Sequence, residues 1–166
     1  MDAEAFKSAM SHFASSVTVV TTDGAAGRAG VTVSAACSVS AEPPSLLVCI
    51  HHLSPAAEAI VRNGRFCVNL LAAGQDRVAD CFAGRVAEFR EDKFAAVQTV
   101  PTPGGCPAIK GATVAFDCKL AEVHRFGTHR LLLGLVEDVR EIDDIPLLYA
   151  NRNYHTIGPI APAGRA

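Results

Sequence analysis

The sequence lacks the features that mark several large classes of protein. None of its 166 residues belongs to an apolar run that approaches the roughly 18 residues of a membrane helix. Lys and Arg number 15 against 17 Asp and Glu, so the basic excess typical of nucleic-acid binding is missing. The N-terminal residues, MDAEAFKSAM, carry acidic side chains and lack the basic-then-apolar order of a signal peptide. We therefore expect one cytoplasmic domain over residues 1–166, with neither nucleic acid nor membrane as a partner.

Motifs of common enzyme classes are missing too. The sequence contains no G-x-G-x-x-G, G-x-S-x-G, H-E-x-x-H or phosphate-loop motif. Its six cysteines include no C-x-x-C pair, and we expect all six to be reduced. His51 and His52 are neighbours in a predicted strand, so their side chains are expected on opposite faces, as a poor chelating pair. His124 and His129 flank a predicted hairpin turn and could lie close together. We predict no metal site.

Runs of β-branched and apolar residues dominate the sequence that is present. Short helices are expected over residues 4–13, 55–63 and 75–82, the second with Ser54 as its N-cap. Residues 85–110 are expected to be the least regular part, and the chain from about residue 159 to be a flexible tail. Strands follow one another with few helices between them, which favours a mainly β, antiparallel barrel. The strands are expected over residues 16–22, 30–40, 45–52, 65–73, 112–126 and 129–142, the last two joined at Gly127-Thr128.

One predicted strand, within GVTVSAACSVSAEPP (residues 30–44), combines small and hydroxylated side chains. Side chains alternate across a strand, so two faces are expected. The apolar face would carry Val31, Val33, Ala35, Cys37 and Val39, and the polar face Thr32, Ser34, Ala36, Ser38 and Ser40. A flat polar ligand could approach the backbone across the polar face. An ordinary half-exposed strand has the same pattern, so the segment alone does not choose between the two.

A protein without an acid–base constellation or a metal cluster must obtain its chemistry from a bound cofactor. Several ordered motifs then identify a family: SVTVVTT, GVTVSAACSVSAEPP, SPAAEAIVRNGRFCVNLL, FAG followed by DKF, PAIKGA, GTHRLLLGLV and LLYANRNYHTI. In order and spacing the chain resembles the flavin reductase family with an FMN-binding split-barrel fold. These proteins are the small reductase components of two-component flavin-dependent monooxygenases. The resemblance implies an antiparallel Greek-key split β-barrel with short flanking helices.

The resemblance also implies an activity and a cofactor site. Family members are homodimers that use NADH, sometimes NADPH, to reduce FMN or FAD, and the reduced flavin passes to a partner monooxygenase. Carried onto this chain, the flavin ring and ribityl chain lie along Thr32, Val33, Ser34 and Ala35. The phosphate lies near the helix that begins after Ser54, whose N-terminus favours an anion. The other residues implied on the phosphate side are Ser38, Ser40, His51, His52 and Lys93.

The nicotinamide side is implied by two further segments. His129 matches the family's hairpin histidine, and Arg152, Tyr154 and His155 match its C-terminal segment. Hydride transfer needs mainly that the two reactants be held in the right geometry, so we assign His129 to positioning rather than to acid–base work. The family often has an acidic residue before this histidine, where this chain has Thr128, which removes one orienting partner.

Two alternatives differ in class from a reductase. A non-enzymatic flavin-binding or electron-carrier protein on the same barrel would not need the His129 and Tyr154-His155 segments. An oxidase of the pyridoxamine-phosphate type would need basic residues that converge on a substrate phosphate, and the 15 Lys and Arg residues are scattered.

Overall fold

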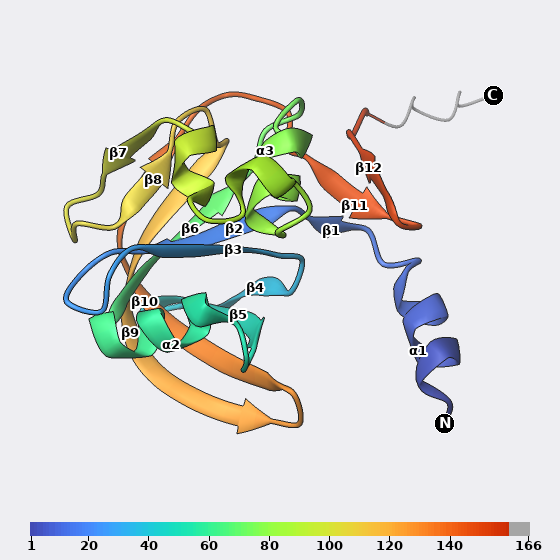
Figure 1. The fold of residues 1–166 in the computed structure, drawn as a ribbon, viewed down its shortest axis with the longest axis horizontal. Coiled ribbons are helices and arrows are strands. Elements are labelled where there is room, and N and C mark those ends of the chain that lie inside the picture. The colour runs from blue at the N-terminus through green and yellow to red at the C-terminus, as the bar shows by residue number, and fades with distance from the viewer. Residues whose placement is uncertain (160–166) are drawn as a thin grey trace.

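A seven-stranded antiparallel sheet organises residues 1–159, the part of the chain that the computed structural model describes (Figure 1). Strands that are far apart in the sequence are neighbours in it, in the order β3-β2-β6-β9-β10-β5-β4. The strands are β2 (Thr18–Thr22), β3 (Ala29–Val33), β4 (Ala36–Ala41), β5 (Pro44–His51), β6 (Arg65–Leu70), β9 (Val114–Phe126) and β10 (His129–Glu141).

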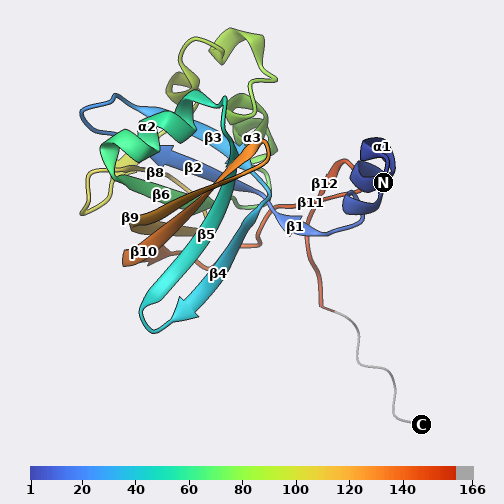
Figure 2. The same ribbon diagram turned by 90° about the horizontal axis from the view of Figure 1, so that it is seen from below.

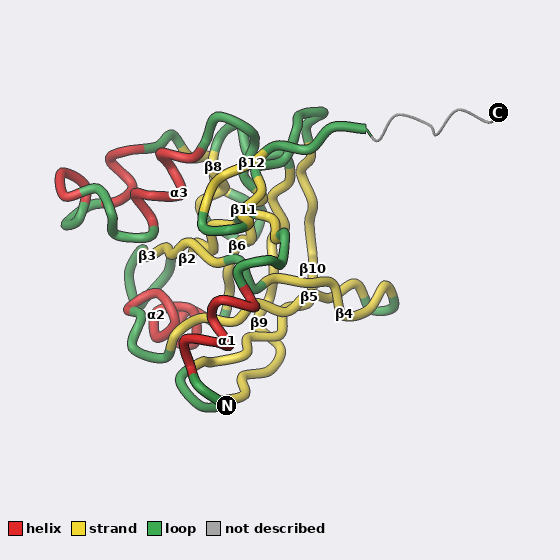
Figure 3. The backbone as a smooth tube through the Cα atoms, turned by 90° about the vertical axis from the view of Figure 1, so that its right-hand side faces the viewer, coloured by secondary structure: helices red, strands yellow, loops and turns green. Residues whose placement is uncertain are grey.

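Smaller elements surround this sheet. One three-stranded sheet joins β1 (Ser15–Ser16), β11 (Leu148–Ala150) and β12 (Asn153–His155), and a two-stranded sheet joins β7 (Thr99–Pro101) and β8 (Pro107–Ile109). Helix α1 and the three-stranded sheet lie on one side of the molecule (Figures 1 and 3). The helices are α1 (Ala3–Met10), α2 (Pro55–Asn63) and α3 (Asp76–Phe82), with 3-10 turns at Ala87–Phe89 and Lys93–Ala96. No helix among the described residues is long and apolar enough to cross a membrane.

The large sheet curls around one hydrophobic core. Val33 of β3 and Val48 of β5 are buried in the same cluster, together with Ile60 of α2 and Phe66 of β6, although β3 and β5 lie near opposite edges of the sheet. The mainly β, antiparallel architecture is therefore confirmed. Within residues 1–159 the edge strands β3 and β4 do not pair, so the hydrogen-bonded sheet is open. The closed Greek-key barrel stays a prediction.

The single strand expected over residues 30–40 is wrong. The chain leaves β3 after Val33 and enters β4 at Ala36, and the Ala35 carbonyl accepts a hydrogen bond from the Cys49 N–H at 2.9 Å. This break arises because β3 pairs with β2 whereas β4 pairs with β5 at the other edge of the sheet. All residues of β4 are exposed, so Cys37 and Val39 do not face the core as alternation predicted. Figure 2 shows the β4–β5 hairpin extending from the sheet.

Helix α1 buries none of its side chains within the described chain. It ends at Met10, although the spacing of its apolar residues predicted a helix to Phe13, and none of its residues is buried. The side chains of Phe6, Met10 and Phe13 are 54%, 43% and 65% exposed. These apolar side chains stay largely exposed and line a hollow that they share with Ser34, Ala35, Tyr149 and Arg152.

Other expectations differ in detail. The expected strand over 16–22 is interrupted at Val17, and the region 85–110 contains the β7–β8 hairpin and two 3-10 turns. Helix α2 follows the prediction: it begins at Pro55 and ends at Gly64, which adopts a left-handed φ of 69°. The predicted flexible tail falls almost entirely on residues 160–166, outside the described residues.

Candidate functional site

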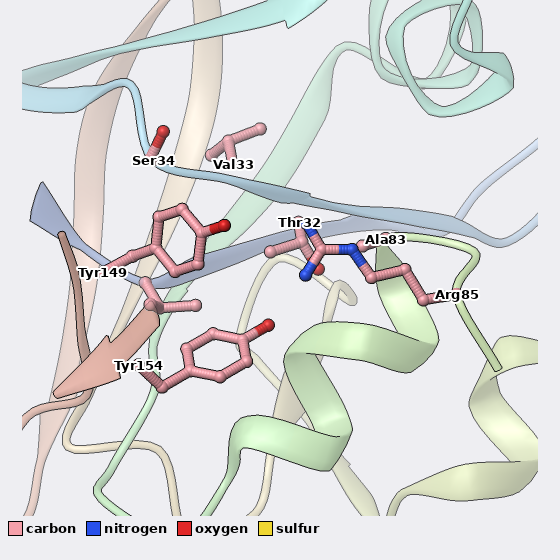
Figure 4. A pocket seen from close by; sticks show the side chains of 8 residues that line it. Thr32, Val33, Ser34, Ala83, Arg85, Tyr149 and Tyr154 are labelled. Carbon is pink, nitrogen blue, oxygen red and sulfur yellow. The ribbon is translucent and has the colours of Figure 1, made fainter. Parts of the chain in front are cut away.

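Strand β3 forms a shared wall of two hollows. The first, which we call the tyrosine hollow, has a volume of about 160 Å³ and lies at the C-terminal end of β3 (Figure 4). The second, the cationic hollow, has a volume of about 290 Å³ and lies at the N-terminal end of β3, against the start of α2. The tyrosine hollow is lined by Val17, Thr32, Val33, Ser34, Ala83, Arg85, Tyr149 and Tyr154. The lining of the cationic hollow includes Arg28, Gly30, Ser54, Ala56, Arg90 and Lys93.

A hydrogen-bonded group around Asp80 shapes the tyrosine hollow. The Tyr154 hydroxyl donates to the Asp80 carboxylate at 2.7 Å, and the Arg85 guanidinium donates to the same oxygen at 3.0 Å. Hydrogen bonds to Asp80 and Tyr149 raise the pKa of Arg85, so its positive charge is secure. Burial, assisted by Asp80, raises the pKa of the Tyr154 hydroxyl, which therefore keeps its proton. The hollow thus presents a cation and phenolic hydroxyls opposite the edge of β3 (Figure 4).

Contacts with α3 fix the position of β3. The Thr32 hydroxyl donates to the Ala79 carbonyl at 2.6 Å, so it is already engaged and its oxygen is left as an acceptor. Gly30 allows close packing, because a Cβ at this position would lie 2.5 Å from Cε1 of Phe82. These contacts hold β3 against α3, whose C-terminal end also borders the tyrosine hollow at Ala83.

The cationic hollow combines the positive side chains of Arg28, Arg90 and Lys93 with the N-terminus of α2, and the acidic Glu91 and Asp92 also line it. Lys93 donates from Nζ to the Phe82 carbonyl at 3.0 Å, and burial lowers the pKa of its ammonium group. The Arg28 guanidinium lies 4.1 Å from the centre of the Phe94 ring. Ser54 precedes α2 without a side-chain capping bond, so its hydroxyl is available to a ligand. This set of donors suits a phosphate group.

Three histidines meet where β5 ends. The rings of His51 and His52 are stacked, with centroids 5.0 Å apart, and the His129 ring contacts His51 edge-on at 5.4 Å. The predicted opposite orientation of His51 and His52 is wrong because β5 ends at His51 and His52 lies in the following turn. The Thr128 hydroxyl lies 3.0 Å from Nδ1 of His129, so the expectation that Thr128 removes an orienting partner is also wrong.

His124 and His129 are not directly paired across the hairpin; they lie diagonally, one pair apart. His124 pairs across the hairpin with Leu131, and its Nε2 lies 2.7 Å from the Glu122 carboxylate. Among residues 1–159, no group of three His, Cys, Asp or Glu side chains is arranged to hold a metal ion. All six cysteines, which lie within the described residues, are unpaired.

Ser38 and Ser40 lie apart from the other predicted phosphate residues. They line a third hollow, of about 340 Å³ and mostly apolar, together with Leu46 and other side chains of the sheet. Ser40 pairs with Ser45 at the start of β5, whereas His51 is at its far end. Strand residues advance about 3.3 Å each, so the predicted grouping of both serines with His51 and His52 is wrong.

The C-terminal segment, residues 152–155, lies near the C-terminal end of β3 and not near His51, His52 and His129. Tyr154 lines the tyrosine hollow, and Arg152 lines a neighbouring hollow with Ser34 and Ala35. His155 is engaged with its own hairpin, its Nε2 lying 3.0 Å from the Ala150 carbonyl oxygen. The roles that the resemblance implied for these residues stay predictions.

Four residues of the site were not singled out in the sequence. Arg85 follows the quoted FAG motif directly, and Tyr149 is paired with Tyr154 across the β11–β12 hairpin, so both could have been found beside residues that were named. Arg28 stands just before β3 in a glycine-rich turn, where a charge gives no periodic signal. Asp80 is an unremarkable acidic residue of α3 until the fold places it between Arg85 and Tyr154.

Comparison with known proteins agrees with this geometry. The model of the flavin reductase like domain matches residues 10–158. The FMN reductase (NADH) RutF of Methylorubrum populi is 45% identical over 165 residues, which cover 99% of this chain and 80% of that protein. Among solved structures, the flavin reductase PheA2 has a TM-score of 0.87 at 32% identity and covers 96% of this chain and 100% of its own.

A second solved structure, nitrilotriacetate monooxygenase component B from Mycobacterium thermoresistibile, has a TM-score of 0.87 at 31% identity and covers 98% of this chain and 92% of its own. These matches extend over nearly the whole chain. The chain belongs to the flavin reductase like family and is an oxidoreductase.

Proposed function

We propose that the chain transfers a hydride from NADH to FMN and releases reduced flavin for use by a separate oxygenase. The observation that carries this proposal is the arrangement along β3, where a hollow with donors for a phosphate and a hollow with donors for a polar ring share one strand. The name of the Methylorubrum populi relative, FMN reductase (NADH), supports FMN and NADH as the substrates.

The residues of the cationic hollow fit the phosphate of a flavin nucleotide. Lys93 and Arg28 supply positive charge, and the N-terminus of α2 lies at the hollow through Ala56, next to the Ser54 hydroxyl. Lys93 is half-buried and uses one of its three donors on the Phe82 carbonyl, which leaves two for a ligand. The ring would then lie at the Thr32–Ala35 end of β3, where Arg85 can donate to its oxygen and nitrogen atoms.

When bound, the flavin supplies the hydride acceptor, so the chain itself needs no nucleophile or metal. The chain contributes by holding the two reactants in contact and by excluding competing reactions. His129 and the C-terminal residues Arg152, Tyr154 and His155 are proposed to bind NADH at two separate places, because His129 lies at the end of β5 and the C-terminal segment lies near Ser34. His129 is exposed and its ring is oriented by Thr128 and His51, which suits a positioning role.

We also propose a partner oxygenase, a homodimer and a cytoplasmic location. The similarity to a monooxygenase component supports an oxygenase as the recipient of reduced flavin. A homodimer is supported by the exposed apolar side chains of Phe6 and Met10 in α1 and of Phe13 just after it, which a second copy could cover. A cytoplasmic location is supported by the six unpaired cysteines. Light scattering of the purified chain tests the dimer, which a monomeric mass would contradict.

The reaction is tested by mixing the purified chain with NADH and FMN without oxygen. Bleaching of the flavin absorbance that depends on both NADH and the chain is expected. FAD and NADPH, tested in the same way, would show whether the second flavin or nicotinamide is accepted. Binding of FMN with no oxidation of NADH would instead favour the electron-carrier alternative.

A further inference from the structure

The tip of the β9–β10 hairpin contacts the turn before α2 through His52, and the neighbouring Arg130 of β10 forms an ion pair with Glu58 of α2 at 2.8 Å. The Thr128 carbonyl accepts two hydrogen bonds from His52, one from the backbone N–H at 2.9 Å and one involving Nδ1 at 2.8 Å. A carbonyl oxygen can only accept, so Nδ1 of His52 carries a proton. His52 is partly buried in this position.

Beyond the ion pair of Arg130 with Glu58, few contacts restrain the tip. Strand β9 pairs with β6 only from Val114 to Lys119, and residues 121–129 are exposed. Strand β10 pairs with β5 as far as His129 opposite His51, so the contact of Thr128 with His52 is the last of that ladder. Ends of hydrogen-bonded ladders open most readily, because their bonds are exposed and few apolar contacts cover them.

The same turn residue holds His129. The Thr128 hydroxyl lies 3.0 Å from Nδ1 of His129, so one residue accepts from His52 through its carbonyl and contacts His129 through its side chain. The His51 ring fills the space between them, stacked on His52 and edge-on to His129. His51 accepts the Leu53 N–H at Nδ1, so its neutral ring carries the proton on Nε2, the opposite tautomer to His52.

We propose that His52 is a positioning residue for the reductase reaction, acting through Thr128 to set where His129 stands relative to the nicotinamide. This inference rests on the proposed function for the direction of its effect on NADH. The resemblance to the family placed His52 on the phosphate side of the flavin. The role proposed here is a different one. His52 itself touches neither reactant in this account.

Two pairs of variants test the proposal, and the side chains within each pair are similar in size. His52→Leu removes the ring donor, whereas His52→Asn keeps an N–H group close to the position of Nδ1. Thr128→Val removes the hydroxyl, whereas Thr128→Ser keeps it. His124→Gln serves as the control, because His124 is an exposed histidine of the same hairpin that contacts Glu122 instead.

We expect His52→Leu and Thr128→Val to raise the KM for NADH about three- to tenfold, the effect of one net hydrogen bond, with the dissociation constant of FMN unchanged. His52→Asn, Thr128→Ser and His124→Gln should stay within about twofold of the parent chain, which is below that effect. Equal KM values for His52→Leu and His52→Asn would overturn the proposal. A parallel loss of FMN affinity would also overturn it, because it would indicate a merely structural role.

A second readout does not depend on activity. Nitrogen-15 NMR of the histidine-labelled chain should show His52 as the Nδ1–H tautomer, and the His129 ring signals should shift in His52→Leu but not in His124→Gln. An unprotonated Nδ1 in His52, or unshifted His129 signals, would overturn the inference even if the chain oxidises NADH. Conversely, the expected NMR result in a chain that does not oxidise NADH would refute the proposed function and leave the hairpin contact intact.

Discussion

Replacement of Lys93 by Met tests the phosphate end of the site. The change removes the ammonium group while keeping a flexible apolar side chain, and it deletes one hydrogen bond to the Phe82 carbonyl. A hydrogen bond to a charged group contributes about 1.5–3 kcal/mol. Lys93 is only half-buried, so water screens its charge and the lower end of that range applies. About 1.5 kcal/mol corresponds to roughly tenfold weaker FMN binding.

Comparison of FMN with riboflavin isolates this effect, since riboflavin has the same ring and ribityl chain but no phosphate. Titration of flavin fluorescence should show weaker FMN binding by Lys93→Met and unchanged riboflavin binding. Lys110→Met is the matched control, because Lys110 is exposed and contacts Gln98 instead. Equal losses of FMN and riboflavin affinity in Lys93→Met would refute the placement of the phosphate in the cationic hollow.

The pH dependence of FMN binding tests the same lysine. Burial lowers the pKa of Lys93 below its ordinary value, and the protonated ammonium is the form that attracts phosphate. FMN affinity should therefore fall as the pH rises through this lowered pKa. In Lys93→Arg the fall should move to higher pH, because a guanidinium stays charged. An FMN affinity that responds to pH identically in both chains would contradict the assignment.

Two further predictions concern stability. Gly30→Ala should destabilise the fold by about 1–3 kcal/mol, because the new Cβ would meet the buried ring of Phe82. Gly158→Ala, which meets no atom within 4 Å, should change stability by less than about 0.5 kcal/mol in the same urea titration, and equal effects would refute the packing argument. Asp117→Asn should lower the free energy of unfolding by about 2 kcal/mol, because the buried carboxylate accepts a hydrogen bond from the Gly104 N–H and lies 3.5 Å from Arg65. An unchanged urea midpoint would contradict this prediction.

Elements that bury an apolar face could be predicted from the sequence. The apolar run over 45–52 became β5, and the signals at Ser54, Pro55 and Gly64 placed the ends of α2. The hairpin turn at Gly127-Thr128 was also correct. These features depend on local chemistry: side-chain period, capping residues and the backbone freedom of glycine.

Features that depend on distant partners could not be predicted. The break at Ser34 arises because β3 and β4 pair at opposite edges of the sheet, and the alternating pattern continues through it without a signal. The stacking of His51 on His52 depends on whether the strand ends one residue earlier or later. The exact residue at which a strand ends is set by tertiary contacts such as the hydrogen bond from His52 to Thr128.

The candidate site was predicted in part, and for a physical reason. The resemblance led to β3, Ser54 and Lys93, and the structure places Ser54 and Lys93 in the lining of one hollow with the N-terminal end of β3. Arg28 was missed because its contacts are remote: its guanidinium donates to Thr99, 71 residues away. Asp80 likewise contacts Tyr154 across 74 residues. Charged residues in loops have no periodicity, so only the fold reveals such groups.

The central claim is that the chain holds a phosphorylated flavin along β3 for reduction by NADH. Steady-state oxidation of NADH by the purified chain, with FMN, FAD and riboflavin compared side by side, tests it most directly. We expect turnover that requires added flavin and a lower KM for FMN than for riboflavin, because only FMN carries the phosphate that the cationic hollow fits. No turnover with any flavin, with or without oxygen, would contradict it.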